Sequence, residues 1–109
     1  MPGPYCVVLI TASGRREAEK LSRTLVSERL AACVSTVPAI HSRYWWKGKI
    51  ETSGEALLIV KTRASFVKKL VRRVRAVHSY TVPEVIALPI AAGNPEYLDW
   101  VGASLQPPK

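Results

Sequence analysis

The chain has 109 residues, of which 48% are apolar, and a formal net charge of +8. This length supports one domain with a hydrophobic core and excludes two, and no apolar run approaches the roughly 20 residues that cross a bilayer. The start of the chain lacks the basic region of a secretory signal, and two cysteines without CxxC spacing are typical of reduced thiols. We predict a single cytoplasmic domain over 1–109, with a core at 5–105 and flexible ends at 1–4 and 106–109.

The first predicted element is a strand over Tyr5–Thr11, which is rich in β-branched and apolar residues. Ser13 and Gly14 follow it as a candidate helix cap. From Arg15 to about Leu30 the apolar residues recur at helical spacing, which predicts a helix. Its core-facing residues are expected to be Ala18, Leu21 and Leu25.

A long hairpin is predicted next. Ala31–Trp46 is extended in pattern and broken at Pro38, and Lys47-Gly48 supplies a tight turn into a second strand, Ile50–Lys61. Sixteen extended residues would stretch about 50 Å, whereas a globule of this size is only about 35 Å across. We therefore expect the hairpin to protrude from the domain.

A basic helix follows the hairpin. Hydroxyl groups between Thr62 and Ser65 are candidate caps, and apolar residues recur at helical spacing to about Val77. The basic residues of this stretch are Lys68, Lys69, Arg72, Arg73 and Arg75. Because they lie opposite the apolar stripe, they indicate a solvated helix face; a nucleic-acid surface is the alternative.

The last two predicted elements are a short strand and a helix. Val85–Ile90 is an apolar run bounded by prolines and a glycine, which predicts a strand. Asn94, Pro95 and Glu96 then supply an N-cap, a proline at the first helical position and a carboxylate near the positive helix end. A third helix is expected to carry Tyr97 to Leu105.

The order strand, helix, strand, strand, helix, strand, with an added helix, predicts an α+β domain of the ferredoxin-like βαββαβ type. Both internal helices then pack on one face of the sheet, and no element is left to cover the other face. Tyr44, Trp45 and Trp46 lie near the hairpin tip. Neighbouring side chains on a strand point to opposite faces, so we expect one tryptophan to face its own subunit and the other a second copy of the chain.

Two other classes of function lack support. The chain has no GxSxG, HExxH or P-loop motif, and its eight acidic residues are scattered, so we predict that it is not an enzyme. An RNA-binding module shares this element order, but it needs aromatic rings on its central strands. The stretch that would carry them, "EALLIVKT", has none.

Four stretches of the chain resemble the CutA family, also called the divalent-ion tolerance proteins. They are "LVSERLAACVSTVPAIHSRYWWKGKIE", "EALLIVKT", "VHSYTVPEVIALPI" and "GNPEYLDWVGASL", and the similarity runs from Val7 to Leu105 in the family's order and spacing. The resemblance implies a ferredoxin-like subunit, a homotrimer joined by its long hairpins and a trimer shape like that of the PII signalling proteins. It also implies binding of copper or other divalent ions and a part in the response to metal ions.

The resemblance carries over only part of a metal site. The family's proposed ligands are a first-strand cysteine, which falls on Ile10, and a histidine pair, which falls on Val77 and His78. Cu(II) accepts imidazole and oxygen ligands, so His78 with Glu84, or with other copies of His78, remains a candidate. The alternative is that His78 makes a structural hydrogen bond in its loop. For Cys6 and Cys33 we expect packed thiols.

A small-molecule site between subunits is a further possibility. Its candidate residues are Glu51, Lys61, Tyr80 and Glu84, which supply charge and hydrogen bonds near turns and loops; the alternative is that they tie subunits together. The function predicted from sequence is therefore a non-enzymatic, homotrimeric CutA-type divalent-cation tolerance protein. Its alternative is a PII-like small-molecule sensor or scaffold without a physiological metal.

Overall fold

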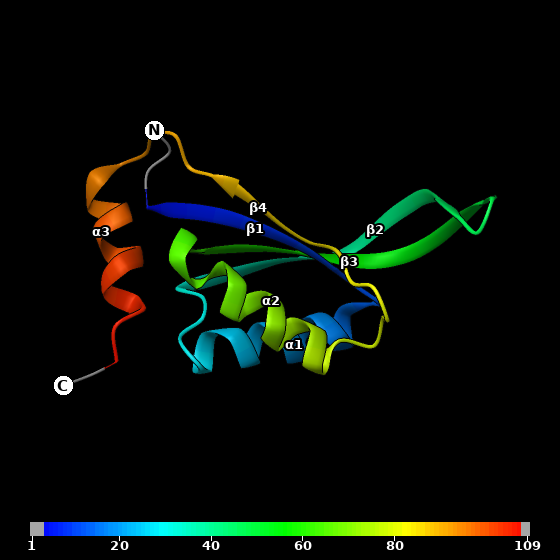
Figure 1. The fold of residues 1–109 in the computed structure, drawn as a ribbon, viewed down its shortest axis with the longest axis horizontal. Coiled ribbons are helices and arrows are strands. Elements are labelled where there is room, and N and C mark those ends of the chain that lie inside the picture. Colours follow the sequence, from blue (N-terminus) through cyan, green and yellow to red (C-terminus); the bar gives the residue numbers. More distant parts are fainter. Residues whose placement is uncertain (1–3, 108–109) are drawn as a thin grey trace.

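The computed structural model describes residues 4–107. Its four strands form one antiparallel sheet in the order β2-β3-β1-β4, which confirms the ferredoxin-like prediction (Figure 1). The elements are β1 (Tyr5–Ala12), α1 (Arg15–Ser27), β2 (Cys33–Trp46), β3 (Lys49–Arg63), a 3-10 turn (Ala64–Phe66), α2 (Val67–Val77), β4 (Val85–Pro89) and α3 (Pro95–Ser104). Among residues 4–107, no helix combines the length and the apolar character needed to cross a membrane.

One face of the sheet holds the core. Burial alternates along β1, because successive side chains point to opposite faces. The side chains on the helix side are sealed by α1 and α2, which both lie on that face (Figure 1). Fully buried members of this core are Val8, Ile10, Leu21, Leu25, Leu58, Val60, Leu70 and Val74.

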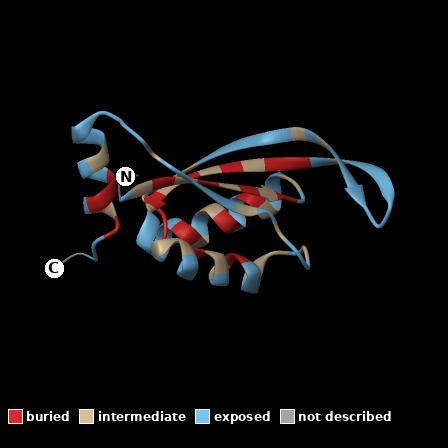
Figure 2. Ribbon diagram, turned by 45° about the horizontal axis from the view of Figure 1, so that its top comes forward, coloured by how far each residue is buried: buried red, intermediate tan, exposed pale blue. Residues whose placement is uncertain are grey.

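The opposite face, here called the open face, is apolar and only partly covered. It consists of Val7, Leu9, Leu57, Ile59, Ile86 and Leu88, which the strand registers place side by side. Ile86 and Leu88 are each 49% exposed, and β4 is drawn mostly as exposed in Figure 2. The sequence-based expectation of an uncovered sheet face is therefore confirmed within the subunit.

The hairpin protrudes as predicted. The molecule measures 47 × 29 × 22 Å, and the paired ends of β2 and β3 extend beyond the helices (Figure 1). Lys47 and Gly48 both adopt positive φ, 50° and 79°, which is the geometry of a type I′ turn. Near the body, Pro38 and Ala39 lie opposite the single residue Ala56, so β2 contains a bulge.

The first helix ends earlier than the sequence pattern indicates. We expected it to run to about Leu30, whereas α1 ends at Ser27. Arg29 takes a left-handed conformation, with φ of 57°, and the amides of Leu30 and Ala31 both donate to the carbonyl of Leu25. This reversal of the chain places Leu30 in the core. The burial of Leu30 outweighs the helical pattern of the sequence, so the helix ends early.

Of the three predicted caps, those at Gly14 and Asn94 are confirmed and the one within residues 62–65 is wrong. Gly14 is the N-cap of α1 without a side-chain bond, and the Glu17 carboxylate accepts the Ser13 amide instead. The hydroxyls of residues 62–65 do not cap the next helix, because Thr62 Oγ1 donates to the Leu30 carbonyl at 2.7 Å. Asn94 caps α3 as predicted, by accepting the Glu96 amide.

The ends of the chain are described only in part. Of the predicted flexible ends, residues 1–3 and 108–109 lie outside the described residues. The Pro4 carbonyl accepts the Ala64 amide at 2.7 Å, and the Gln106 amide donates to Ala103 at 3.2 Å. Both residues therefore take part in ordered backbone hydrogen bonds.

Candidate functional site

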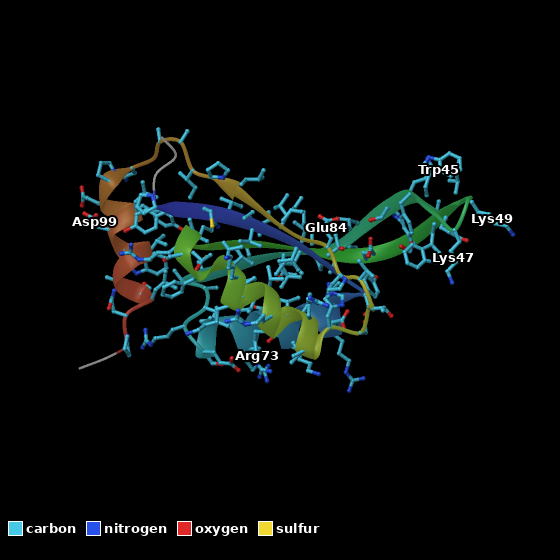
Figure 3. The ribbon with its side chains drawn as sticks, in the orientation of Figure 1. Trp45, Lys47, Lys49, Arg73, Glu84 and Asp99 are labelled. Atoms are coloured by element: carbon cyan, nitrogen blue, oxygen red, sulfur yellow. The ribbon has the colours of Figure 1, made fainter. Side chains whose placement is uncertain are left out.

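A cavity of about 690 Å³ opens where the loop between α2 and β4 meets the base of the hairpin. We call this cavity the cleft. Its lining includes Thr11, Tyr44, Trp46, Glu55, Tyr80 and Glu84. Figure 3 shows Glu84 beside the point where the hairpin leaves the body. The cleft thus combines carboxylates, a phenol and aromatic rings from four segments of the chain.

The bulge in β2 decides which tryptophan lines the cleft. Before the bulge Val37 pairs with Leu57, but after it Ile40 pairs with Glu55, so the even-numbered residues of β2 now share a face with Glu55. Trp46 therefore lines the cleft, whereas Trp45 points to the other side with its cross-strand partner Ile50.

His78 is held by hydrogen bonds at both ring nitrogens. Its side chain is completely buried. The Tyr80 amide donates to Nδ1 at 3.0 Å, so Nδ1 carries no proton, and Nε2 therefore donates its proton to the Thr11 carbonyl at 2.7 Å. A metal ion at His78 would have to displace one of these partners.

Glu17 anchors the start of the same loop from α1. Its Oε1 accepts the Ser13 amide at 2.9 Å and its Oε2 accepts the Ser79 amide at 2.7 Å. Burial opposes the charge, but hydrogen bonds from Ser13 and Ser79 prevail and lower the pKa of Glu17 to about 2. Its carboxylate also lies 3.8 Å from Nδ1 of His78. Glu17 therefore ties the loop to α1 through the Ser79 amide and lies beside His78.

Tyr80 points from this loop toward the hairpin. Its hydroxyl donates to Oε2 of Glu55 at 2.7 Å, and its ring lies 4.7 Å from the ring of His78. Burial, followed by the hydrogen bond and the charge of Glu55, raises the pKa of Tyr80 well above its usual value. Tyr80 is therefore a neutral hydrogen-bond donor at physiological pH.

The cleft carries negative charge without a close counterion. Glu55 is buried, Glu84 is exposed, and neither forms an ion pair within residues 4–107. Arg43 also lines the cleft but lies beyond salt-bridge distance of both carboxylates. In the same part of the chain, no three His, Cys, Asp or Glu side chains are grouped to hold a metal ion.

The remaining predicted site residues are distributed along the sheet. Glu51 lies opposite Tyr44 on the hairpin. Lys61 lies near the other end of β3, opposite Cys33, with Nζ 3.5 Å from the Ser35 hydroxyl. The structure thus brings Tyr80 and Glu84 together with Tyr44 and Trp46, and leaves Lys61 of the same subunit outside the cleft.

The family's other ligand positions offer no donor here. Ile10 lies fully buried on the helix side of the sheet, and Val77 packs at the edge of the core. Cys6 is buried, which raises the pKa of its thiol, and Cys33 is half-buried beside Lys61. Both thiols are free. Cys6 is packed in the core, as expected from the sequence, whereas Cys33 is not a member of the core cluster.

Sequence reasoning missed Thr11, Glu17 and Glu55. Their partners lie 67, 62 and 25 residues away along the chain. No local spacing marks such contacts. A carboxylate on an otherwise apolar strand, as at Glu55 in "EALLIVKT", is the only sequence feature that points to one of them.

Comparisons with known proteins agree on one family. The model of the CutA1 divalent ion tolerance protein matches residues 6–104. The divalent-cation tolerance protein CutA of Thermus thermophilus is 53% identical over 87% of this chain and 92% of its own. The chloroplastic protein CutA 1 of rice is 50% identical over 90% of this chain, which spans only 55% of the rice protein.

Solved structures give the same result. The crystal structure of CutA from Xylella fastidiosa superposes with a TM-score of 0.92 at 41% identity, covering 95% of this chain and all of that one. CutA1 from rice superposes at 0.91 with 48% identity over 94% of each chain. The shared elements include the sheet, the helices and the long hairpin described above. This chain belongs to the CutA1 divalent ion tolerance family.

Proposed function

We propose that the protein is a non-enzymatic, cytoplasmic homotrimer that binds a divalent cation in the cleft and takes part in the response to metal ions. The observation that carries the proposal is the unpaired negative charge of Glu55 and Glu84 beside an uncovered sheet. The name of the Thermus relative, a divalent-cation tolerance protein, supports the class of ligand.

The open face supports self-association. Ile86 and Leu88 are large apolar side chains on adjacent positions of one face of β4, and both remain half in water. Burying apolar surface contributes about 25 cal/mol per Å², so a second copy that covers this face stabilises the assembly. A closed ring of identical subunits leaves no such face exposed, and three copies in a PII-like arrangement is the form we propose.

The cleft suits a cation that accepts oxygen ligands. Glu55, Glu84 and the Tyr80 hydroxyl line one cavity, and Glu51 lies on the same face of the hairpin. Hard divalent ions prefer carboxylate oxygens of this kind. One subunit does not supply a complete set of ligands among its described residues. The proposal therefore includes ligands from a neighbouring copy. It also places Lys61 at the junction between subunits, where Lys61 is not a metal ligand.

His78 enters the proposal as the residue that shapes the loop. Its two hydrogen bonds join the loop to β1 and to the Tyr80 amide, and so place the Tyr80 hydroxyl in the cleft. Cu(II) favours imidazole, and a site on His78 would require the loop to open. A preference for Cu²⁺ therefore indicates a site on His78 with the loop open, whereas a preference for Mn²⁺ indicates a site on the carboxylates of the cleft.

Calorimetric titration with Mn²⁺, Zn²⁺ and Cu²⁺ tests the cation site, with light scattering for the mass. We expect a mass three times the 12.0 kDa of the chain and cation binding that weakens in the variant Glu55→Gln/Glu84→Gln. Glu19→Gln/Glu28→Gln, at two exposed carboxylates outside the cleft, is the control with the same change of net charge. A measured mass equal to that of one chain would show that the proposed trimer is wrong. Binding unchanged in the double variant but lost in His78→Gln moves the site to His78.

A second candidate function is the binding of a small molecule in the same cleft. The cavity of about 690 Å³ and its aromatic lining by Tyr44 and Trp46 favour this candidate. Thermal denaturation with metabolite mixtures, in the presence of a chelator, separates the two functions. Stabilisation by a metabolite without metal supports the second candidate, whereas stabilisation only by metal supports the first.

A further inference from the structure

A second cavity lies on the helix side of the molecule, where the end of α1 meets α2 and the segment after α3. Its volume is about 740 Å³, and among the described residues it shares no lining side chain with the cleft. We call it the helix cavity. Figure 3 shows Arg73, which lines it, beside the helices and away from Glu84. The charged residues of the lining are Glu28, Arg29, Lys69, Arg72 and Arg73.

The α2 side of the helix cavity is one face of that helix. Lys69, Arg72 and Arg73 are three or four residues apart, so their side chains are neighbours on the helix surface. No acidic residue occurs from 56 to 83, so α2 brings positive charge to the cavity without a carboxylate of its own. Part of the basic surface that was predicted to be a solvated helix face therefore borders a cavity.

Two of the four cations are held in place by other parts of the fold. Arg73 donates to the carboxylate of Glu28, from Nε at 2.9 and 3.1 Å and from Nη2 at 2.9 Å. Nη1 of Arg29 donates to the Ser104 carbonyl at 2.8 Å. A guanidinium group has five N–H donors, so both arginines keep donors for a ligand. Because their positions are already fixed, less entropy is lost when a ligand binds.

The helix cavity remains positive after these contacts. Four cations and one carboxylate leave three positive charges in excess. Within residues 4–107, neither Lys69 nor Arg72 forms an ion pair. The negative end of α1 and the positive end of α2 both lie at the cavity and oppose each other, so the side chains decide the sign of its potential.

The rest of the lining suits the uncharged part of a ligand. Phe66 supplies a half-buried aromatic ring at the start of α2. Leu30, Ala76 and Leu105 add apolar surface. Small-molecule sites combine such surface with a few converging polar groups, in cavities of about 300–1,000 Å³. The helix cavity has both the size and the composition of such a site.

We propose that the helix cavity binds a small anion with two linked phosphate groups, either inorganic diphosphate or the phosphate chain of a nucleoside diphosphate. Guanidinium groups match phosphate oxygens with paired N–H donors, and an ammonium group adds a point charge. A diphosphate carries more negative charge than a single phosphate, so it complements the excess of cations better. The inference depends neither on the proposed cation site in the cleft nor on the proposed trimer.

Calorimetric titration with ADP, diphosphate and orthophosphate tests the proposal, at low salt in buffer freed of divalent metal. Lys69→Gln/Arg72→Gln removes two exposed cations of the helix cavity and should weaken the binding of ADP and diphosphate roughly tenfold or more. Lys68→Gln/Arg75→Gln, at two exposed cations of α2 outside the cavity lining, is the control with the same change of net charge. Both variants should keep the circular dichroism of the wild type.

The titrations also distinguish the two sources of the diphosphate group. ADP that binds more tightly than diphosphate, by a margin that Phe66→Leu removes, identifies a nucleotide whose base contacts the aromatic ring. Equal affinities for ADP and diphosphate identify the inorganic anion.

Three results would overturn the proposal. One is no heat of binding from ADP or diphosphate at low salt. Another is equal weakening in the cavity variant and its control, which indicates unspecific attraction to a basic helix. The third is a short RNA oligonucleotide that binds more tightly than ADP and is weakened equally by both variants, which assigns the basic face of α2 to nucleic acid. None of these results affects the cation site, because Glu55 and Glu84 lie in the cleft.

Discussion

The two faces of the sheet differ although the same strands make both. On the helix side Leu58 is fully buried, whereas Leu57, the preceding residue of β3, is only partly covered on the open face. On β1 the same contrast separates Val8 from Val7. Both faces are apolar, so composition does not distinguish them. The helix side is completed by this chain, and we propose that other copies complete the open side.

The largest effect on the fold of the subunit is expected from Leu58→Ala. Removing a fully buried leucine leaves a cavity and costs about 2–5 kcal/mol of unfolding free energy. Urea denaturation at fixed protein concentration measures this loss. Leu57→Ala is the matched control and should instead increase the dependence of the melting temperature on protein concentration. Equal losses that are independent of concentration would contradict the distinction between the two faces.

A smaller effect is expected from Glu17→Gln, at the loop end of the helix side. Because the pKa of Glu17 falls from 4.5 in the unfolded chain to about 2 in the fold, its stabilisation is present above pH 4.5 and is lost as the pH falls toward 2. This shift corresponds to about 3 kcal/mol at neutral pH as an upper value.

Denaturation of both proteins across pH 2–7 measures that contribution. The wild type should lose stability between about pH 4.5 and 2, and Glu17→Gln should show a shallower slope there, because glutamine does not titrate. Parallel slopes in the two proteins would assign the acid sensitivity to other carboxylates.

The smallest effect on the fold of the subunit is expected from Leu88→Ser on the open face. The side chain is half-exposed, so its loss should leave the far-UV circular dichroism and the cooperativity of unfolding unchanged. Light scattering should show a shift of mass from trimer to monomer. A variant that unfolds as it dissociates would show that the open face is part of the folding core.

Most of the fold follows from local patterns. Alternation in β1, helical spacing in α1 and α2, and the Asn94-Pro95 start of α3 each depend on neighbours within a few residues, and the structure has all of these elements. Helix ends were less predictable. Leu30 is drawn back to the core by contacts that its neighbours in the sequence do not reveal.

The site was less predictable than the fold, because its contacts are remote in sequence. The resemblance pointed to His78, but its hydrogen bond to Thr11 depends on how β1 and the loop come together. The face of each tryptophan depends on one extra residue in the bulge at Pro38. A pattern of period two cannot place Trp45 and Trp46 unless that insertion is known.

The bulge in β2 also bears on how the protein avoids forming fibres. β2 is an edge strand of 14 residues, and a long unpaired edge is a template for open-ended strand addition. Pro38 lacks an amide proton, and the extra residue twists the strand, so the edge is divided into the short segments 33–37 and 40–46. A passing strand can align with one segment but not continue through both. We therefore expect the same irregularity that turns Trp46 into the cleft to limit amyloid-like growth along this edge.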